Sequence, residues 1–159
     1  MHTYADDRGF SIMSVFDHLA EVPGQVNTSW MYAGAVKAWH RHILQDDHWV
    51  VLRGNLKIGL YNTEPSAIVA ELRLAGPTPG TEVIQPIEVA PQSGRAVYLA
   101  ERRAGVLRIP HGLWHGGVAV GGVDALLLYY MTRRYNPQKP DEERSVWNAF
   151  PFDWGIEFK

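Results

Sequence analysis

The chain has 159 residues, with 15 Lys and Arg against 17 Asp and Glu, 7 His and no Cys. This length predicts a single domain over residues 1–159, and the absence of cysteine excludes a disulfide framework, thiol catalysis and a zinc–thiolate site. The near-neutral charge gives no general reason to bind nucleic acid or an anionic membrane. No apolar run is long enough to span a bilayer and the charged start does not resemble a signal peptide, so we expect a soluble, cytoplasmic protein.

Short apolar runs between turn residues predict strands along most of the chain. A short helix is expected near Val15–Ala20, and the runs His48–Arg53 and Leu56–Tyr61 are expected to pair as a hairpin across Gly54-Asn55. A second short helix is expected near Pro140–Val146. The remaining predicted strands are Ile68–Leu74, Val83–Val89, Ala96–Leu99, Val106–Ile109, Gly116–Val120 and Ala125–Thr132. This pattern is typical of an all-β sandwich or small barrel, for which a binding module without catalytic chemistry is one interpretation.

Five of the seven histidines lie in two short stretches, which are His40, His42 and His48 in the first and His111 and His115 in the second. His40 and His42 would point to the same side of a strand, because side chains alternate along it, and Asp47 follows after a short bend. Three imidazoles and one carboxylate that converge in a barrel would suit one divalent ion, Zn, Fe, Mn or Ni depending on the geometry. The predicted metal ligands are His40, His42, Asp47 and His115, and no organic cofactor is implied.

The spacing of these residues is specific. Gly34-x5-His40-x-His42-x4-Asp47-x6-Gly54, followed by Pro110-x-Gly112-x2-His115, resembles the two motifs of the cupins. Asp47 stands where those motifs usually have glutamate, and Ala119 replaces the final asparagine of the second motif. The resemblance implies a cupin double-stranded β-helix, a jelly-roll barrel, with short N- and C-terminal extensions.

Longer segments of the sequence point to one particular family of cupins. They are Asp7-Arg8-Gly9-Phe10, the segment from Gln25-Val-Asn27-Thr-Ser29 through Lys37-Ala-Trp39-His40, the segment Leu107 to Gly116, Tyr129-Tyr-Met-Thr132-Arg-Arg-Tyr135-Asn-Pro137, and the closing Trp147-Asn148 and Asp153-Trp154. Together they cover nearly the whole chain and resemble the dTDP-4-dehydrorhamnose 3,5-epimerases. The resemblance also implies a homodimer in which N-terminal residues reach the partner's site.

Epimerisation beside a keto group needs a base on one face of the carbon, an acid on the other and a positive group near the enolate oxygen. By the resemblance, His40 takes the position of the base and Tyr129 that of the acid. Arg8 and Lys37 take the positions of phosphate-binding cations, with Lys37 in place of an arginine that would bind phosphate through two hydrogen bonds. The other substrate-binding residues implied are Gln25, Asn27 and Tyr135.

The sequence differs from the family at two positions that take part in catalysis. Asp47 stands in place of the family's catalytic lysine, and Ala149 in place of the aspartate that orients the base, for which Asp153 is a candidate substitute. Because His42 also replaces a glutamine, the changes indicate a metal-binding pocket. In it a divalent ion would replace the lysine as the positive group that stabilises the enolate oxygen. If His40 were a ligand it would not be the base, and Tyr129, His48 or His111 would have to act instead.

The function expected from the sequence is therefore proton transfer beside the keto group of a dTDP-linked deoxysugar, with or without metal assistance. One alternative is a metal-dependent cupin of another reaction, such as a small-molecule isomerase or an iron dioxygenase. The other is a cupin that only binds a sugar or nucleotide, which the missing lysine and aspartate would permit.

Overall fold

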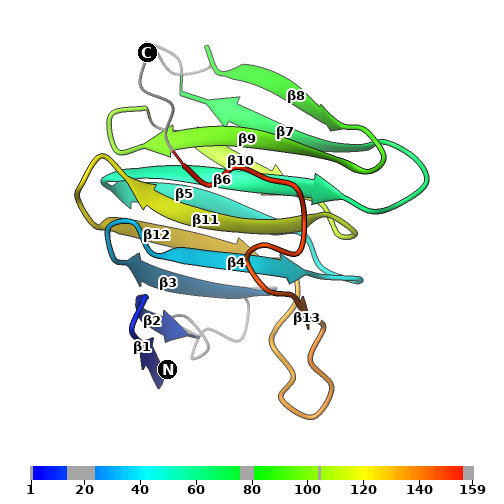
Figure 1. Ribbon diagram of the computed structural model, residues 1–159. Helices are drawn as coiled ribbons and strands as arrows, with labels where there is room; N and C mark the ends of the chain where they lie inside the picture. The colour runs from blue at the N-terminus through cyan, green and yellow to red at the C-terminus, as the bar shows by residue number, and fades with distance from the viewer. Residues whose placement is uncertain (1, 14–23, 76–80, 104, 156–159) are drawn as a thin grey trace.

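Two antiparallel sheets face one another in the computed structural model, which describes residues 2–13, 24–75, 81–103 and 105–155 (Figure 1). In spatial order, the larger sheet consists of β1 (His2–Asp6), β2 (Gly9–Met13), β3 (Gln25–Met31), β12 (Ala125–Met131), β5 (Asp47–Arg53), β10 (Gly105–Ile109), β7 (Ile68–Leu74) and β8 (Val83–Val89). The smaller sheet consists of β13 (Glu143–Arg144), β4 (Val36–Arg41), β11 (Trp114–Val120), β6 (Asn55–Asn62) and β9 (Ser93–Ala100). No helix occurs among the described residues, so the all-β prediction is confirmed.

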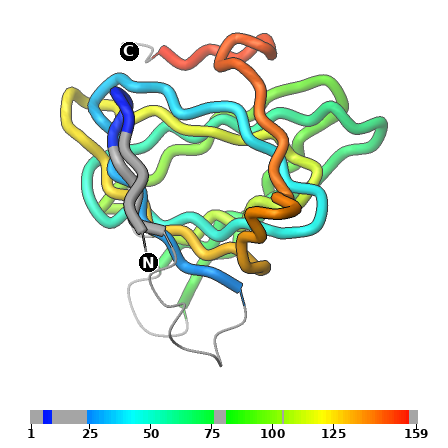
Figure 2. The backbone as a smooth tube through the Cα atoms, turned by 90° about the horizontal axis from the view of Figure 1, so that it is seen from below, coloured from blue at the N-terminus to red at the C-terminus, as the bar shows by residue number. Residues whose placement is uncertain are grey.

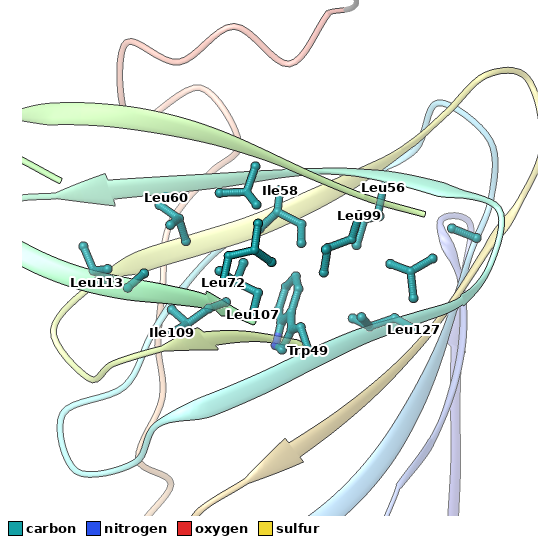
Figure 3. Packing of buried hydrophobic residues seen from close by; sticks show 14 of the residues in the cluster. Trp49, Leu56, Ile58, Leu60, Leu72, Leu99, Leu107, Ile109, Leu113 and Leu127 are labelled. Atoms are coloured by element: carbon teal, nitrogen blue, oxygen red, sulfur yellow. The ribbon is translucent and has the colours of Figure 1, made fainter. Parts of the chain in front are cut away.

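The period-two pattern of the strands sets which side chains enter the space between the sheets. On β3 and at the start of β5, every second residue is buried, which turns Ser29 and Met31 on one strand and Asp47 and Trp49 on the other inward. The main core lies between the sheets, and Figure 3 shows side chains from β6, β7, β9 and β10 meeting there. Its fully buried members include Leu56, Ile58, Leu60, Leu99, Leu107 and Ile109.

The C-terminal arm, residues 136–155, runs from the end of β12 in the larger sheet to the outer face of the smaller one (Figure 2). Paired backbone hydrogen bonds of 2.9 and 3.0 Å join Trp39 to Ser145, next to the pairing of β13 with β4. The arm's aromatic side chains pack on those of the sheet, with Trp154 4.7 Å from Trp39 and Phe150 stacked on Tyr61 at 4.6 Å between ring centroids. Because the arm covers its outer face, β6 is buried on both sides.

Each of the predicted strands is present, but two other local predictions are wrong. The strands on either side of Gly54 do not form a hairpin, since β5 lies in the larger sheet and β6 in the smaller one. Gly54 has a φ of 74°, which turns the chain from one sheet to the other in a single residue. The predicted helix at Pro140–Val146 is instead an extended segment containing β13, because pairing with β4 overrides the local preference. The helix predicted near Val15–Ala20 lies outside the described residues.

Candidate functional site

A cavity of about 720 Å³ opens between the sheets, at the end of the barrel where β4 and β12 finish and β5 begins. Side chains from both sheets and from the C-terminal arm line it. They include His40, His42, Asp47, His115 and Tyr129, so the structure brings the predicted metal ligands and the predicted acid–base pair into one space. A volume of this size is within the range of small-molecule sites.

Three of the predicted ligands form a compact group in the wall of this cavity. The ligand atoms of His42, Asp47 and His115 all lie within 4.8 Å of one another, and the three residues are buried. The Nε2 atoms of His42 and His115 lie 3.7 and 3.6 Å from Oδ2 of Asp47. His42 follows the end of β4, Asp47 begins β5 and His115 belongs to β11, so the group joins the two sheets.

Backbone carbonyls fix how the two imidazoles are turned. The Nδ1 atom of His42 contacts the carbonyl oxygen of Asp141 at 2.5 Å, and Nδ1 of His115 contacts that of Leu113 at 3.0 Å. A carbonyl oxygen only accepts hydrogen bonds, so Nδ1 is the donor in both rings and Nε2 carries the lone pair in the neutral form. Two lone pairs and a carboxylate oxygen that converge in this way fit a divalent cation, and the outer hydrogen bonds are those that metal-bound histidines usually make.

Asp47 is 3% exposed and stays ionised in this setting. Burial alone raises the pKa of its carboxyl group, but the close imidazole of His115, then that of His42, and the Trp49 indole N–H together outweigh it and lower that pKa. Its Oδ1 accepts a hydrogen bond from the Gln45 side chain at 3.1 Å, and its Oδ2 accepts one from Trp49 at 3.2 Å. The carboxylate is thus held in a fixed orientation towards the histidines.

His40 lies beside this group but is not part of it. Its ring centroid is 6.3 Å from that of His115, to which it is opposite in the β4–β11 pairing. Burial, followed by the charge of His115, lowers the pKa of His40 to about 4, so the imidazole is neutral at neutral pH. His40 lines the cavity, and no hydrogen bond to its ring is present within the described part of the chain.

Tyr129 occupies the β12 side of the same cavity. It lies opposite Asn27 in the β12–β3 pairing, and its ring is 6.5 Å from that of Trp49. Burial, followed by the charges of Asp47 and Glu142, raises the pKa of its hydroxyl group above the usual value. Tyr129 therefore keeps its proton at neutral pH, as an acid in this position would have to.

The predicted substrate-binding residues divide into two groups. Arg8, Lys37 and Tyr135 line the cavity, with the Arg8 guanidinium paired to Asp6. Lys37 Nζ donates to the Ser29 hydroxyl at 3.1 Å, and burial lowers the pKa of Lys37.

Gln25 and Asn27 are buried and are not among the described residues that line the cavity. Gln25 accepts a hydrogen bond from the backbone N–H of Tyr135 at 2.8 Å and donates one to Asn27 at 2.9 Å. In the structure they support the residues that line the cavity.

The other candidates for catalysis lie outside the cavity lining. Ala149 stands at the family's aspartate position and has no carboxylate to orient His40. Asp153, the candidate substitute, is exposed, accepts a hydrogen bond from the Gly155 N–H and does not line the cavity. The His48 ring lies 5.8 Å from Tyr130. His111 is paired with Asp46 at 2.9 Å, with 61% of its side chain exposed.

Sequence reasoning missed Asp141 and Glu142, which the arm carries into the cavity lining. Glu142 is paired with Arg144 at 3.0 Å, its side chain is 20% exposed, and its charge acts on both His40 and Tyr129. Nothing in the local sequence signals this, because the two acids lie about a hundred residues from His42 and reach it only through the docked arm.

The fold and the site together define a cupin with a cavity in its barrel that is lined by histidines and other titratable side chains. No family model matches the chain. Among characterised proteins it is similar to the spore coat polysaccharide biosynthesis protein SpsL of Bacillus subtilis, with 32% identity over 98% of this chain and 92% of that protein. It is also similar to the probable low-salt glycan biosynthesis epimerase Agl13 of Haloferax volcanii, with 31% identity over 96% of this chain and 88% of that protein.

Solved structures share the fold at lower identity. The chain matches the dTDP-4-dehydrorhamnose 3,5-epimerase of Bacillus anthracis with a TM-score of 0.60 and 17% identity, over 99% of this chain and 83% of that one. It matches the Staphylococcus aureus capsular polysaccharide assembling protein CapF with a TM-score of 0.57 and 19% identity, covering 90% of this chain but only 33% of CapF. With the two relatives above, these matches show that the chain belongs to the RmlC-like family of cupins, which includes the dTDP-4-dehydrorhamnose 3,5-epimerases.

No helix among the described residues is long and apolar enough to cross a membrane.

Proposed function

We propose that this protein is a nucleotide-sugar epimerase that moves a proton at the carbon beside a keto group of a dTDP-linked deoxysugar. The observation that carries the proposal is the cavity of about 720 Å³ in which a neutral imidazole and a protonated phenol both face the same space. The names of the Haloferax and Bacillus anthracis proteins, both epimerases, support the same reaction class.

In this proposal His40 is the base and Tyr129 is the acid. A base must be unprotonated before it removes the proton, and the lowered pKa of His40 meets that condition. The acid on the opposite face must be protonated so that it can donate a proton to the carbon, and the raised pKa of Tyr129 meets this second condition. The two residues come from different sheets, β4 in the smaller and β12 in the larger, which supports assigning them to opposite sides of a bound substrate.

We further propose that His42, Asp47 and His115 hold one divalent ion, Zn, Fe, Mn or Ni. The predicted fourth ligand, His40, is left out of the group, so it remains available as the base. A divalent ion bound there would polarise the keto oxygen and stabilise negative charge on it, which is the task that a lysine at position 47 would otherwise perform. The cluster of His42, Asp47 and His115 supports this proposal through its donor set and its fixed imidazole orientations.

Substrate binding is assigned to the cavity residues with charge or aromatic surface. Arg8 and Lys37 provide positive charge for a diphosphate, and Tyr135 provides a ring and a hydroxyl group at the rim. Because Arg8 is paired with Asp6, the substrate would have to share or displace that carboxylate. Gln25 and Asn27 contribute indirectly, by holding Tyr135 and the floor of the site.

The test of the reaction is solvent deuterium exchange. A dTDP-4-keto-6-deoxy sugar is incubated with the protein in heavy water, and its carbons next to the keto group are followed by NMR. The proposal predicts incorporation of deuterium with wild-type protein and none with buffer alone. Tight binding without exchange would instead show a binding module.

A second candidate function rests on the same three ligands. Two histidines and one carboxylate with open positions are also the ligand set of non-haem iron oxygenases. Oxygen consumption that requires ferrous ion, together with no deuterium exchange in the keto sugar, would favour that reaction over epimerisation.

We also propose a homodimer in the cytoplasm, with N-terminal residues reaching the partner's site. Light scattering of the eluting protein tests the oligomeric state, and a monomeric mass would refute that part of the proposal.

A further inference from the structure

Asp141, on the C-terminal arm, accepts four hydrogen bonds from the segment His42–Gln45. Its side-chain oxygens accept hydrogen bonds from three successive backbone N–H groups, those of Ile43, Leu44 and Gln45, at 3.0, 2.9 and 3.0 Å. Its backbone carbonyl accepts the Nδ1–H of His42 at 2.5 Å. The arm thus binds the loop between β4 and β5 through both the side chain and the main chain of one residue.

This loop carries or adjoins two of the three proposed ligands. His42 begins it, and Asp47 follows it as the first residue of β5. Gln45, whose N–H binds Asp141, also donates its side-chain amide to Oδ1 of Asp47 at 3.1 Å. A chain of direct contacts therefore runs from Asp141 to His42 on one side and, through Gln45, to Asp47 on the other.

We infer that Asp141 is a positioning residue of the metal centre, through which the docked arm fixes two of the three ligands. The inference rests on the proposed metal centre and deepens it. Hydrogen bonds to the outer nitrogen of a metal-bound histidine fix its tautomer and ring orientation, and their loss typically weakens metal binding by about 10–100-fold. Removal of the Asp141 carboxylate releases the loop N–H groups and lets the carbonyl of residue 141 move away from His42.

The arm is well placed for this task because other contacts hold it firmly. Trp39 Nε1 donates to the carbonyl of Trp147 at 2.9 Å, and Glu143 pairs with Arg41 on the outer side of β4. These contacts do not involve the three ligands, so they anchor the arm independently of any metal. Asp141 transmits that rigidity to the ligand loop.

The chain offers a matched control at the other end of β12. The carboxylate of Asp124 accepts hydrogen bonds from the backbone N–H of Ala33 and from Trp30 Nε1, each at 3.0 Å. Like Asp141, it holds a loop to the barrel, but it is not among the described residues that line the cavity. Asp124→Ala and Asp141→Ala should both destabilise the fold, while only the second should disturb the metal centre.

The experiment measures zinc affinity by competition with a chromophoric chelator, alongside the melting temperature of the metal-free proteins. We expect Asp141→Ala to weaken zinc binding by about 10–100-fold, and Asp124→Ala to leave the affinity unchanged although it lowers the melting temperature. Asp141→Asn, which keeps one acceptor oxygen, should fall between wild type and Asp141→Ala, and it carries the test if Asp141→Ala does not fold.

Zinc affinity of the Asp141 variants equal to that of wild type would overturn the inference and leave the metal centre standing. An equal loss of affinity in Asp124→Ala would also overturn it, since the effect would then be one of general stability. Wild-type protein that binds no zinc would refute the metal centre itself, and this inference with it.

Discussion

At the scale of single residues, His40 and His42 are only two positions apart but have different surroundings. β4 ends at Arg41, between them, so His40 is held in the sheet opposite His115 while His42 belongs to the loop that Asp141 binds. We therefore propose His40 for proton transfer and His42 for binding a metal ion. Changing each of them should affect different measurements.

His40→Asn should lower the rate of deuterium exchange into the keto sugar by about 10²–10⁴-fold, which is the rate enhancement that a general base typically contributes. Zinc affinity should not change, because His40 is outside the cluster of His42, Asp47 and His115. Loss of zinc binding in this variant would show that His40 is a fourth ligand, as the sequence alone suggested.

Tyr129→Phe should lower turnover by a similar factor, about 10²–10⁴-fold, because the ring is kept and only the acidic hydroxyl group is lost. Tyr130→Phe provides the matched control, since the neighbouring ring lies beside His48 and is not among the described residues of the cavity lining. The measurement is the turnover rate of each variant with the keto sugar. Equal rates for Tyr129→Phe and wild type would show that Tyr129 is not the acid.

At the scale of elements, the packing of the C-terminal arm on the smaller sheet contributes to the stability of the fold. Gly59 on β6 leaves room for it, because a Cβ atom there would lie 2.7 Å from Trp154, 2.9 Å from Phe152 and 2.9 Å from Trp39. Gly59→Ala should therefore overpack the aromatic layer and reduce the free energy of unfolding by about 1–3 kcal/mol.

Urea titration measures this change. Gly117→Ala on the neighbouring β11 is the control, since its nearest contact would be the flexible side chain of Leu56 at 3.3 Å, and a smaller loss is expected. If both variants were equally stable, the arm would not be packed against β6 as described.

The elements also show what a sequence reveals about such a fold. The strands from His48 to Thr132 were predictable because each has a short apolar run between turn residues, and the spacing of His40, His42, Asp47 and His115 predicted one pocket. The sheet to which each strand belongs was not predictable, so Leu56–Tyr61 was paired with the wrong neighbour. The arm's extended course and the placement of Asp141 depend on contacts across about a hundred residues, which no local pattern records.

At the scale of the whole molecule, the proposed metal ligands connect the two sheets. Asp47 belongs to the larger sheet and His115 to the smaller one, while His42 lies in the loop between β4 and β5. An ion held by all three binds the folded state only, so it should stabilise the protein by about 2.7 kcal/mol at a free concentration of 100 times its Kd.

Addition of zinc to the metal-free protein should therefore raise its melting temperature, as measured by calorimetry. His115→Asn removes one ligand and should abolish the rise while His40→Asn retains it. A rise of the same size in His115→Asn would locate the zinc elsewhere on the molecule.

The claim on which this account depends most is that His42, Asp47 and His115 form a metal centre from which His40 is excluded. The most direct measurement is elemental analysis of protein purified without chelator, for wild type, His40→Asn and His115→Asn. The account predicts a divalent metal equimolar with the chain in wild type and in His40→Asn, and its loss in His115→Asn. Wild-type protein without metal, which also takes up none on reconstitution, would contradict the account.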